Sequence, residues 1–192
     1  NDTWFADSLL RVGNGTEDVD DQGNILLPED ICLPSTGEVD DLEKLIDHVF
    51  PSLDDNMSDS NYMTSRAILS TTNDNVDKIN IHMIDRFHGD EVIYHSFDIA
   101  EDDPYGYYAQ EFLNGLTPNG LPPHALKLKL NCPVILLRNI DPANGLCNGT
   151  RLVVRGFERN TIDAEIAIGQ HAGRRVFLPR IPLCPSENDM FL

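Results

Sequence analysis

Apolar residues recur at helical spacing in three stretches of the first half of the chain. They predict helices over Thr3–Val12, Val39–Val49 and 73–87, because one face of each would be apolar and the other polar. A short apolar run at Ala67–Leu69 stands directly before the third helix and predicts a buried strand. Strand and helix together would form one βα unit, while the polar, acidic residues 52–61 predict a loop.

The pattern changes to short β-prone runs in the second half of the chain. A strand is expected near Glu91–Phe97 and a helical turn at Tyr108–Leu113. Five further strands are expected near Leu126–Leu130, Val134–Asn139, Arg151–Gly156, Thr161–Ile168 and Arg174–Leu178. Turn residues at Glu158–Asn160 and Gly169–Gly173 separate the last three, and such dense short strands are typical of a small barrel of SH3-like or OB-like type. The predicted fold class is α/β followed by a small β-barrel.

A rigid Gly-Leu-Pro-Pro-His linker at 120–124 marks an expected domain boundary. We therefore divide the chain into an acidic helical and loop segment (1–60), an α/β segment (61–119), the barrel (120–181) and a connector (182–192). No apolar run is long enough to span a membrane, and no secretory signal stands at the start, so we expect no membrane partner. The chain reads as an internal piece of a longer protein.

The net charge of −18 is distributed unevenly along the chain. Residues 1–110 hold 25 acidic and 5 basic side chains, whereas residues 111–192 hold 7 and 9. The first part would repel a polyanion and the second would not. The four cysteines form no CxxC pair, which is typical of free thiols in a reducing, intracellular compartment.

Sequence motifs for catalysis are missing from this chain. It contains no GxxxxGK[ST], GxSxG or GxGxxG motif and no HExxH, so we expect no catalytic, cofactor-binding or metal-binding residue. Residues 18–29 are close to an EF-hand loop, but Pro28 stands at its eleventh position and the preceding helix is broken by Gly13 and Gly15. An acidic turn is favoured there, with Ca²⁺ binding as the alternative.

Two places carry side chains suited to phosphate and sugar contacts. Hydroxyl and amide groups at a strand-to-helix junction could hold a phosphate or simply cap the helix; they are Ser70, Thr71, Thr72 and Asn73. The stretch from 127 to 151 adds basic and short polar groups: Lys127, Lys129, Arg138, Asn139, Asn148, Thr150 and Arg151. Asn139 and Asn148 could instead shape the turn between them through hydrogen bonds to the backbone.

The second of these places also resembles a known family. LKLNCPVILLRNIDPANGLCNGTRLVV (128–154), with GLPPH before it, resembles the PIF family of ATP-dependent 5′-to-3′ DNA helicases, and the plant and Helitron-like branch most. SRAILSTTNDNVDKIN (65–80), FADSLLRVGNG (5–15) and FLPRIPLCPSEN (177–188) are similar to other parts of that family.

The resemblance implies a superfamily-one helicase segment that lies downstream of the ATP-binding motifs. Residues 61–119 would then be part of the second RecA-like domain, 120–181 the SH3-like barrel, and 182–192 the connector to later motifs. The segment would contact single-stranded DNA without sequence preference and would pack on other RecA-like domains of the same polypeptide. ATP and Mg²⁺ would serve the parent protein only, so the segment alone would be inactive.

The same resemblance implies a nuclear or organellar protein with roles in DNA repair, recombination and telomere maintenance. The residues alone leave a different class open, an acidic protein-interaction module that binds no DNA. Affinity for DNA that resides in 120–181 and falls steeply with salt would discriminate the two.

Overall fold

The computed structural model describes residues 3–35, 37, 40–100, 103, 105–116, 118 and 121–184. Gly120 and 185–192, which belong to the predicted linker and connector, lie outside the described residues. The chain divides into two compact units, Asn1–Asp41 and Leu42–Leu192, and each is described by itself. Among the described residues no helix combines the length and apolar character that crossing a membrane requires.

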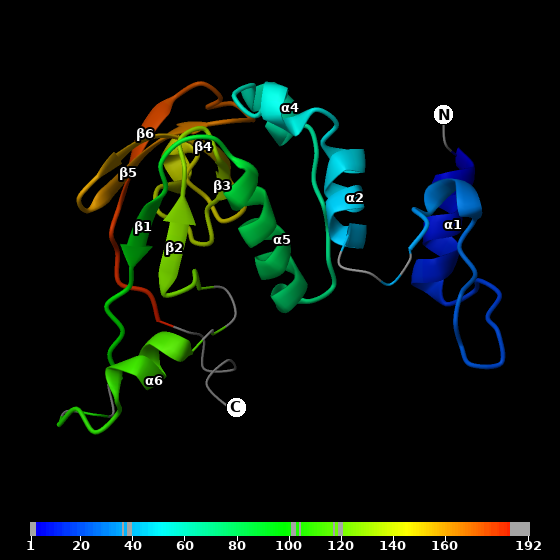
Figure 1. The fold of residues 1–192 in the computed structure, drawn as a ribbon, viewed down its shortest axis with the longest axis horizontal. Helices are drawn as coiled ribbons and strands as arrows, with labels where there is room; N and C mark the ends of the chain where they lie inside the picture. The colour runs from blue at the N-terminus through cyan, green and yellow to red at the C-terminus, as the bar shows by residue number, and fades with distance from the viewer. Residues whose placement is uncertain are drawn as a thin grey trace. The chain divides into compact units, whose positions relative to one another are not determined.

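The first unit consists of α1 (Thr3–Asn14), a turn and the 3-10 helix η1 (Glu29–Ile31), as Figure 1 shows. The helix predicted over Thr3–Val12 is confirmed. The EF-hand-like stretch forms a tight turn in which the Asp20 carboxylate accepts hydrogen bonds from the backbone N–H groups of Gln22 (2.9 Å) and Asn24 (2.8 Å). These bonds, those of Asn24 foremost, lower the pKa of Asp20. The carboxylate therefore closes its own turn, which is the acidic turn favoured from the sequence.

The second unit begins with four helices: α2 (Asp40–Val49, starting at the boundary), α3 (Leu53–Asn56), α4 (Ser60–Thr64) and α5 (Asn73–Arg86). The helices predicted at 39–49 and 73–87 are confirmed. The loop predicted over 52–61 is wrong, because that stretch holds α3 and the start of α4. Buried Leu53 and Met57 anchor it to the core, and the Asp59 carboxylate caps α4.

The strand predicted at Ala67–Leu69 is also wrong. In the described part of the chain these residues belong to no strand, and Leu69 is 90% exposed. Ile68 packs against the core, so only part of the apolar run is buried. No neighbouring described strand offers backbone partners to this segment, and the βα unit expected from the sequence is therefore not formed here.

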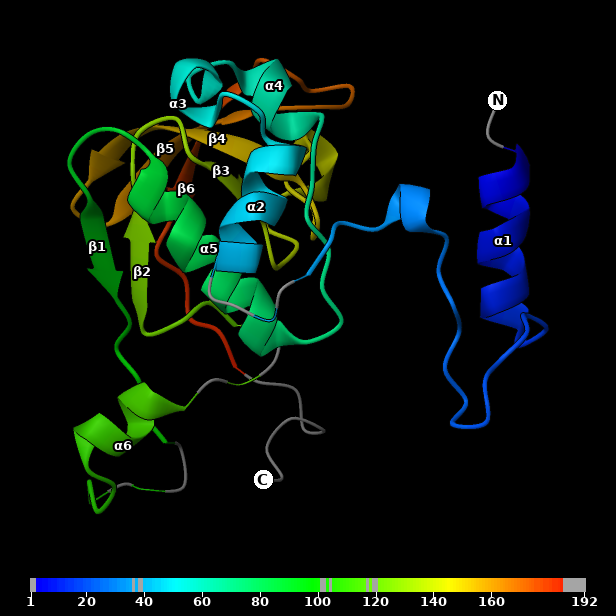
Figure 2. The same ribbon diagram turned by 45° about the vertical axis from the view of Figure 1, so that its right-hand side comes forward.

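Two antiparallel sheets complete the second unit (Figures 1 and 2). β1 (Val92–His95) pairs with β2 (Ala125–Leu128), with Ile93 opposite Lys127. The four-stranded sheet runs in the order β3 (Pro133–Ile135), β4 (Arg151–Glu158), β5 (Thr161–Ile166) and β6 (Arg175–Pro179). Two short helices lie outside the sheets: α6 (Gln110–Gly115) and the 3-10 helix η2 (Pro142–Asn144).

The mixed α/β composition and all six strands predicted from 91 onwards are confirmed. Two expectations about their arrangement differ from the structure. β2 pairs with β1 and not with the strands that follow it. Among the described residues β3 and β6 are free edges of an open sheet, so no closed barrel is formed.

One core joins residues from both sides of the expected boundary at 120. Ile46, Phe50 and Phe87 from the helical part pack in the same cluster as Leu128 and Val154 from the β part. The helices α2 and α5 lie side by side (Figure 2), and Arg86 donates to Asp47 at 2.7 Å across them. A smaller cluster fills one face of the four-stranded sheet; it contains Leu146, Leu152, Ala164, Ile166 and Val176.

Candidate nucleic-acid interface

The connection between β3 and β4 is folded by its own short polar side chains. The side-chain oxygen of Asn139 accepts a hydrogen bond from the backbone N–H of Asn148 at 2.8 Å. The Thr150 hydroxyl donates to the Gly145 carbonyl (2.9 Å) and accepts from the Cys147 N–H (3.1 Å). These bonds satisfy backbone groups that no strand partner reaches, so the loop holds one shape.

Gly145 lets a second loop approach this connection. Its φ of +84° favours glycine, and a Cβ added there would lie 2.6 Å from Cδ2 of His171. His171 belongs to the turn between β5 and β6, which therefore packs directly on the β3–β4 connection. The two loops meet at the same end of the four-stranded sheet.

A pocket of about 460 Å³ lies between these two loops. We call it the loop pocket. It is lined by Pro142, Gly145, Asn148, Gly149, Thr150, Arg151, Ile166, Ile168, Gly169, Gln170 and His171. The lining contains no carboxylate and one guanidinium group, so an anion would meet no repulsion from the pocket wall.

Several polar side chains of the loop pocket are available to a ligand. The side chains of Asn148, Gln170 and His171 make no hydrogen bond to any described residue, and the first two are exposed. Arg151 uses Nη1 to donate to the Thr64 carbonyl at 2.9 Å, which fixes the guanidinium, and no carboxylate in the described part of the chain pairs with it. Donors of this kind suit phosphate and sugar oxygens.

The predicted residues Asn148, Thr150 and Arg151 are thus brought together in one pocket. Asn139 does not line the pocket, but its side chain accepts the hydrogen bond from the Asn148 backbone. Arg138 lies next to Asn139 in the chain, where it donates from Nη2 to the Cys184 carbonyl at 3.1 Å. Its Nε is buried and has no partner within the described part of the chain.

The two predicted lysines lie elsewhere, Lys127 on β2 and Lys129 directly after it. Nζ of Lys129 donates to the carbonyls of Phe87 (2.7 Å) and Asp85 (3.3 Å) and so caps the C-terminal end of α5. Lys127 is exposed and lies 3.8 Å from the carboxylate of Glu91. The structure gives Lys129 a structural partner and leaves Lys127 on the surface.

The predicted junction Ser70–Asn73 stands at the opposite end of α5. Thr71, Thr72 and Asn73 are exposed, and the Thr72 side chain makes no capping hydrogen bond although it occupies the N-cap position. A helix of 14 residues is roughly 20 Å long, so this junction and Lys129 are not parts of one site.

Three of the basic side chains beyond residue 124 pair with carboxylates, namely Lys127, Arg155 and Arg175. The bond from Arg175 is the main cause that lowers the pKa of Asp163, so this pair stays ionised and locked together. Arg155 also donates to Asn131 and to Ser60 of α4, which ties β4 to the helical part. The positive charge that is available to a ligand in this part of the chain therefore comes chiefly from the arginines other than Arg155 and Arg175.

Sequence reasoning missed Gln170 and His171. Both stand in the Gly169–Gly173 stretch, which was interpreted only as a turn. Two polar side chains with hydrogen-bonding capacity between glycines were the available signal. That they face the β3–β4 connection is a consequence of the tertiary fold.

The family comparison falls on this same part of the chain. Residues 111–157 match the family described as DNA helicase Pif1, 2B domain. The matched stretch contains nearly all of α6, β2, β3, the whole β3–β4 connection and nearly all of β4. No curated protein matches the chain. The match supports a Pif1-like helicase segment and suggests an interaction with nucleic acid.

Proposed function

We propose that this chain is a segment of a Pif1-like, ATP-dependent 5′-to-3′ DNA helicase whose loop pocket contacts the backbone of single-stranded DNA. The observation that carries the proposal is the coincidence of two findings: the 2B-domain match includes the β3–β4 connection, and that connection forms a carboxylate-free pocket. ATP and Mg²⁺ would be bound by other parts of the parent protein.

Contact through the loop pocket would be tolerant of sequence. The available groups are amides, an imidazole and a fixed guanidinium, which suit phosphate and sugar oxygens rather than a particular base edge. In the same proposal residues 61–119 would belong to the second RecA-like domain of the parent protein, and residues 120–181 would belong to its SH3-like domain. We also propose that the parent protein belongs to the plant and Helitron-like branch of the family. Its location would be nuclear or organellar.

The test is fluorescence anisotropy of a labelled single strand of ~15 nucleotides, titrated with the 192-residue chain. The informative variants are Asn148→Ala and Gln170→Ala, because both remove an amide that has no partner among the described residues. Arg138→Ala and Arg151→Ala are less informative, since both arginines also hold structural hydrogen bonds. Each amide variant is expected to weaken binding roughly 3- to 10-fold, as loss of one hydrogen bond would.

Asn80→Ala is the matched control, because it removes an exposed amide from α5, far from the loop pocket in the chain. It should bind as the unaltered chain does. The proposal fails if the unaltered chain does not bind at low salt, or if Asn80→Ala weakens binding as much as the two pocket variants.

One observation favours the alternative of a protein-interaction module. The acidic stretch after β1 exposes large apolar side chains, with Ile99 at 85%, Tyr105 at 80% and Tyr107 at 82%. Exposed aromatic groups among carboxylates suit a basic protein partner better than DNA. A chain that binds no single strand at low salt but retains a basic peptide through these tyrosines would favour this alternative.

A further inference from the structure

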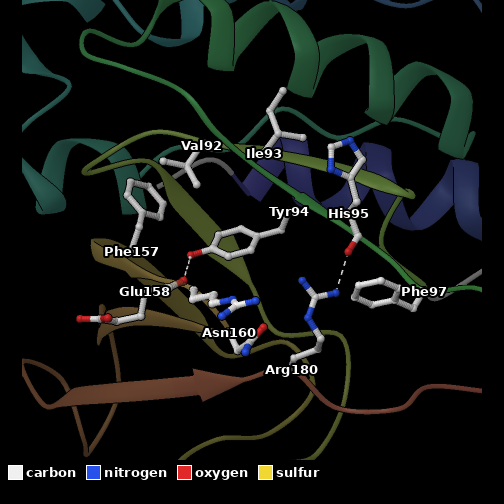
Figure 3. Close-up of a pocket in the computed structure, with 10 residues that line it drawn as sticks. Val92, Ile93, Tyr94, His95, Phe97, Phe157, Glu158, Asn160 and Arg180 are labelled. Carbon is white, nitrogen blue, oxygen red and sulfur yellow. Dashed lines mark hydrogen bonds between the residues drawn. The ribbon is translucent and has the colours of Figure 1, made fainter.

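A second pocket, of about 560 Å³, lies near the turn between β4 and β5 (Figure 3). It is formed by β1 with Phe97 beyond it, by residues 157–160 and by Arg180 just after β6. We call it the β1 pocket. The loop pocket lies at the start of β4 and the β1 pocket at its end, so the two are distinct sites.

The β1 pocket gathers aromatic rings that the sequence scatters. Tyr94 donates its hydroxyl hydrogen to the Glu158 carbonyl at 2.7 Å, and its ring lies 6.4 Å from that of Phe157. Burial raises the pKa of Tyr94, so the hydroxyl stays a neutral donor. Phe97 differs from both, because it is 84% exposed. Such a ring in a pocket offers a stacking face to a ligand.

Positive charge accompanies the exposed ring. The Arg180 guanidinium lies 5.2 Å from the centre of the Phe97 ring and donates from Nη1 to the His95 carbonyl at 2.6 Å (Figure 3). Arg159 is exposed and has no partner among the described residues. In Figure 3 the carboxylate of Glu158 points away from Arg180 and Phe97. No carboxylate of the described residues forms an ion pair with either guanidinium, so both can attract an anion.

We propose that the β1 pocket binds one nucleotide of a single strand, with the base stacked on the open face of Phe97 and the phosphate held by Arg159 and Arg180. Stacking on an aromatic ring beside cationic groups is how proteins hold single strands without reading sequence. The ring and the cations come from residues 97, 159 and 180, which only the fold brings together. The inference rests on the proposed function, since it takes single-stranded DNA as the ligand.

The two pockets are separated by the length of β4. Its eight residues span roughly 25 Å at the usual rise of a strand. A single strand that occupies both pockets must therefore run along the sheet for several nucleotides. Loss of the stacked base would leave the phosphate contacts in the loop pocket intact.

The test compares two labelled probes on the 192-residue chain: an oligothymidylate and an abasic strand of the same length, each ~15 nucleotides. Phe97→Leu keeps an apolar side chain and removes the ring. It is expected to weaken oligothymidylate binding roughly 5- to 100-fold, the usual cost of one stacked base. Binding of the abasic strand should be unchanged, because that strand has no base to stack.

Phe177→Leu is the matched control, since Phe177 is an exposed ring on β6 that does not line the β1 pocket. Arg159→Ala should weaken both probes equally, because each carries phosphates. Unchanged oligothymidylate binding by Phe97→Leu would overturn the inference, and so would an equal loss in Phe177→Leu. Binding of an oligo-glutamate peptide as tight as that of oligothymidylate would also overturn it, since a peptide carries no base.

Failure of this inference is distinguishable from failure of the proposed loop-pocket function. If Asn148→Ala weakens binding and Phe97→Leu does not, only the stacking site is wrong. If Phe97→Leu weakens binding and Asn148→Ala does not, the strand is held at the β1 pocket and the loop pocket is wrong. A chain that binds neither probe overturns both.

Discussion

Asn139 and Asn148 are joined by a hydrogen bond of 2.8 Å, in which the backbone N–H of Asn148 donates to the side-chain oxygen of Asn139. The bond uses the side chain of one asparagine and only the backbone of the other. The two residues therefore have different roles: Asn139 shapes the β3–β4 connection, while the Asn148 amide is free to meet a ligand.

This division of roles predicts different effects of two similar substitutions. Asn139→Ala should lower the free energy of unfolding by about 1 kcal/mol, because it leaves the Asn148 N–H without its acceptor. Asn148→Ala should change the free energy of unfolding by less than about 0.5 kcal/mol, since the hydrogen bond uses its backbone. Urea denaturation of both variants measures this, and equal losses of stability would contradict it.

The contact between Gly145 and His171 predicts a second pair of effects. Both Gly145 (φ +84°) and Gly149 (φ +85°) adopt left-handed backbone conformations, so alanine at either position costs about 1 kcal/mol of strain. Only at Gly145 would the new Cβ meet a neighbour, at 2.6 Å from Cδ2 and 3.2 Å from Cβ of His171.

Gly145→Ala should therefore destabilise the protein by about 1–3 kcal/mol more than Gly149→Ala. It should also push the β5–β6 turn away and weaken single-strand binding. Thermal unfolding of the two variants, with DNA anisotropy beside it, provides the comparison. Equal melting temperatures would show that the His171 ring moves aside at no cost.

Lys127 lies on β2 and Lys129 directly after it, so the two allow a matched test of structural against surface charge. Lys129→Ala removes the donor to the Asp85 and Phe87 carbonyls at the end of α5 and should cost about 1–2 kcal/mol. Lys127→Ala removes an exposed pair at 3.8 Å and should cost less than about 0.5 kcal/mol. The midpoints of urea unfolding of the two variants, compared at constant m-value, measure the two losses of stability.

The cysteines should differ sharply in reactivity. Burial raises the pKa of Cys132 from 9.0 to about 11, whereas Cys32 and Cys184 are exposed. At pH 8 iodoacetamide should modify the exposed pair within minutes and leave Cys132 unmodified until the protein unfolds. Mass spectrometry of the alkylated peptides reads this directly; modification of Cys132 at the rate of Cys184 would contradict its burial.

The same thiol predicts a loss of stability at alkaline pH. Because the pKa in the folded state is raised, the contribution of Cys132 is fully present below about pH 9 and is lost as the pH rises towards 11. Cys132→Ala should remove this part of the pH dependence. Unfolding midpoints of both proteins between pH 8 and 10 provide the measurement.

Periodicity was sufficient to predict the long elements. The helix at 73–87 and the strands after 125 follow from repeated apolar positions, and the structure confirms them. It was not sufficient for α3, where Leu53 and Met57 are isolated in a polar run and their burial depends on the distant strand β4 and the rest of the core. Pairing of β2 with β1 likewise depends on partners 30 or more positions away, which the local pattern does not encode.

The residues of the candidate site likewise fall into those that the sequence could group and those that only the fold brings together. Asn139, Asn148, Thr150 and Arg151 could be grouped from the sequence because they share one short loop. Gln170, His171 and the aromatic side of the β1 pocket could not, since they come from other loops and strands that meet only in the folded chain. The sequence also did not reveal that Lys129 donates to a carbonyl at the end of α5.

Hydrogen exchange of the 192-residue chain with and without a saturating single strand tests the central claim most directly. We predict slower exchange at residues 145–151 and 167–171, which form the two sides of the loop pocket, and no change in residues 3–35. Protection confined to other parts of the chain, or none at DNA concentrations that saturate anisotropy, would contradict the assignment of the loop pocket as a DNA-contacting surface.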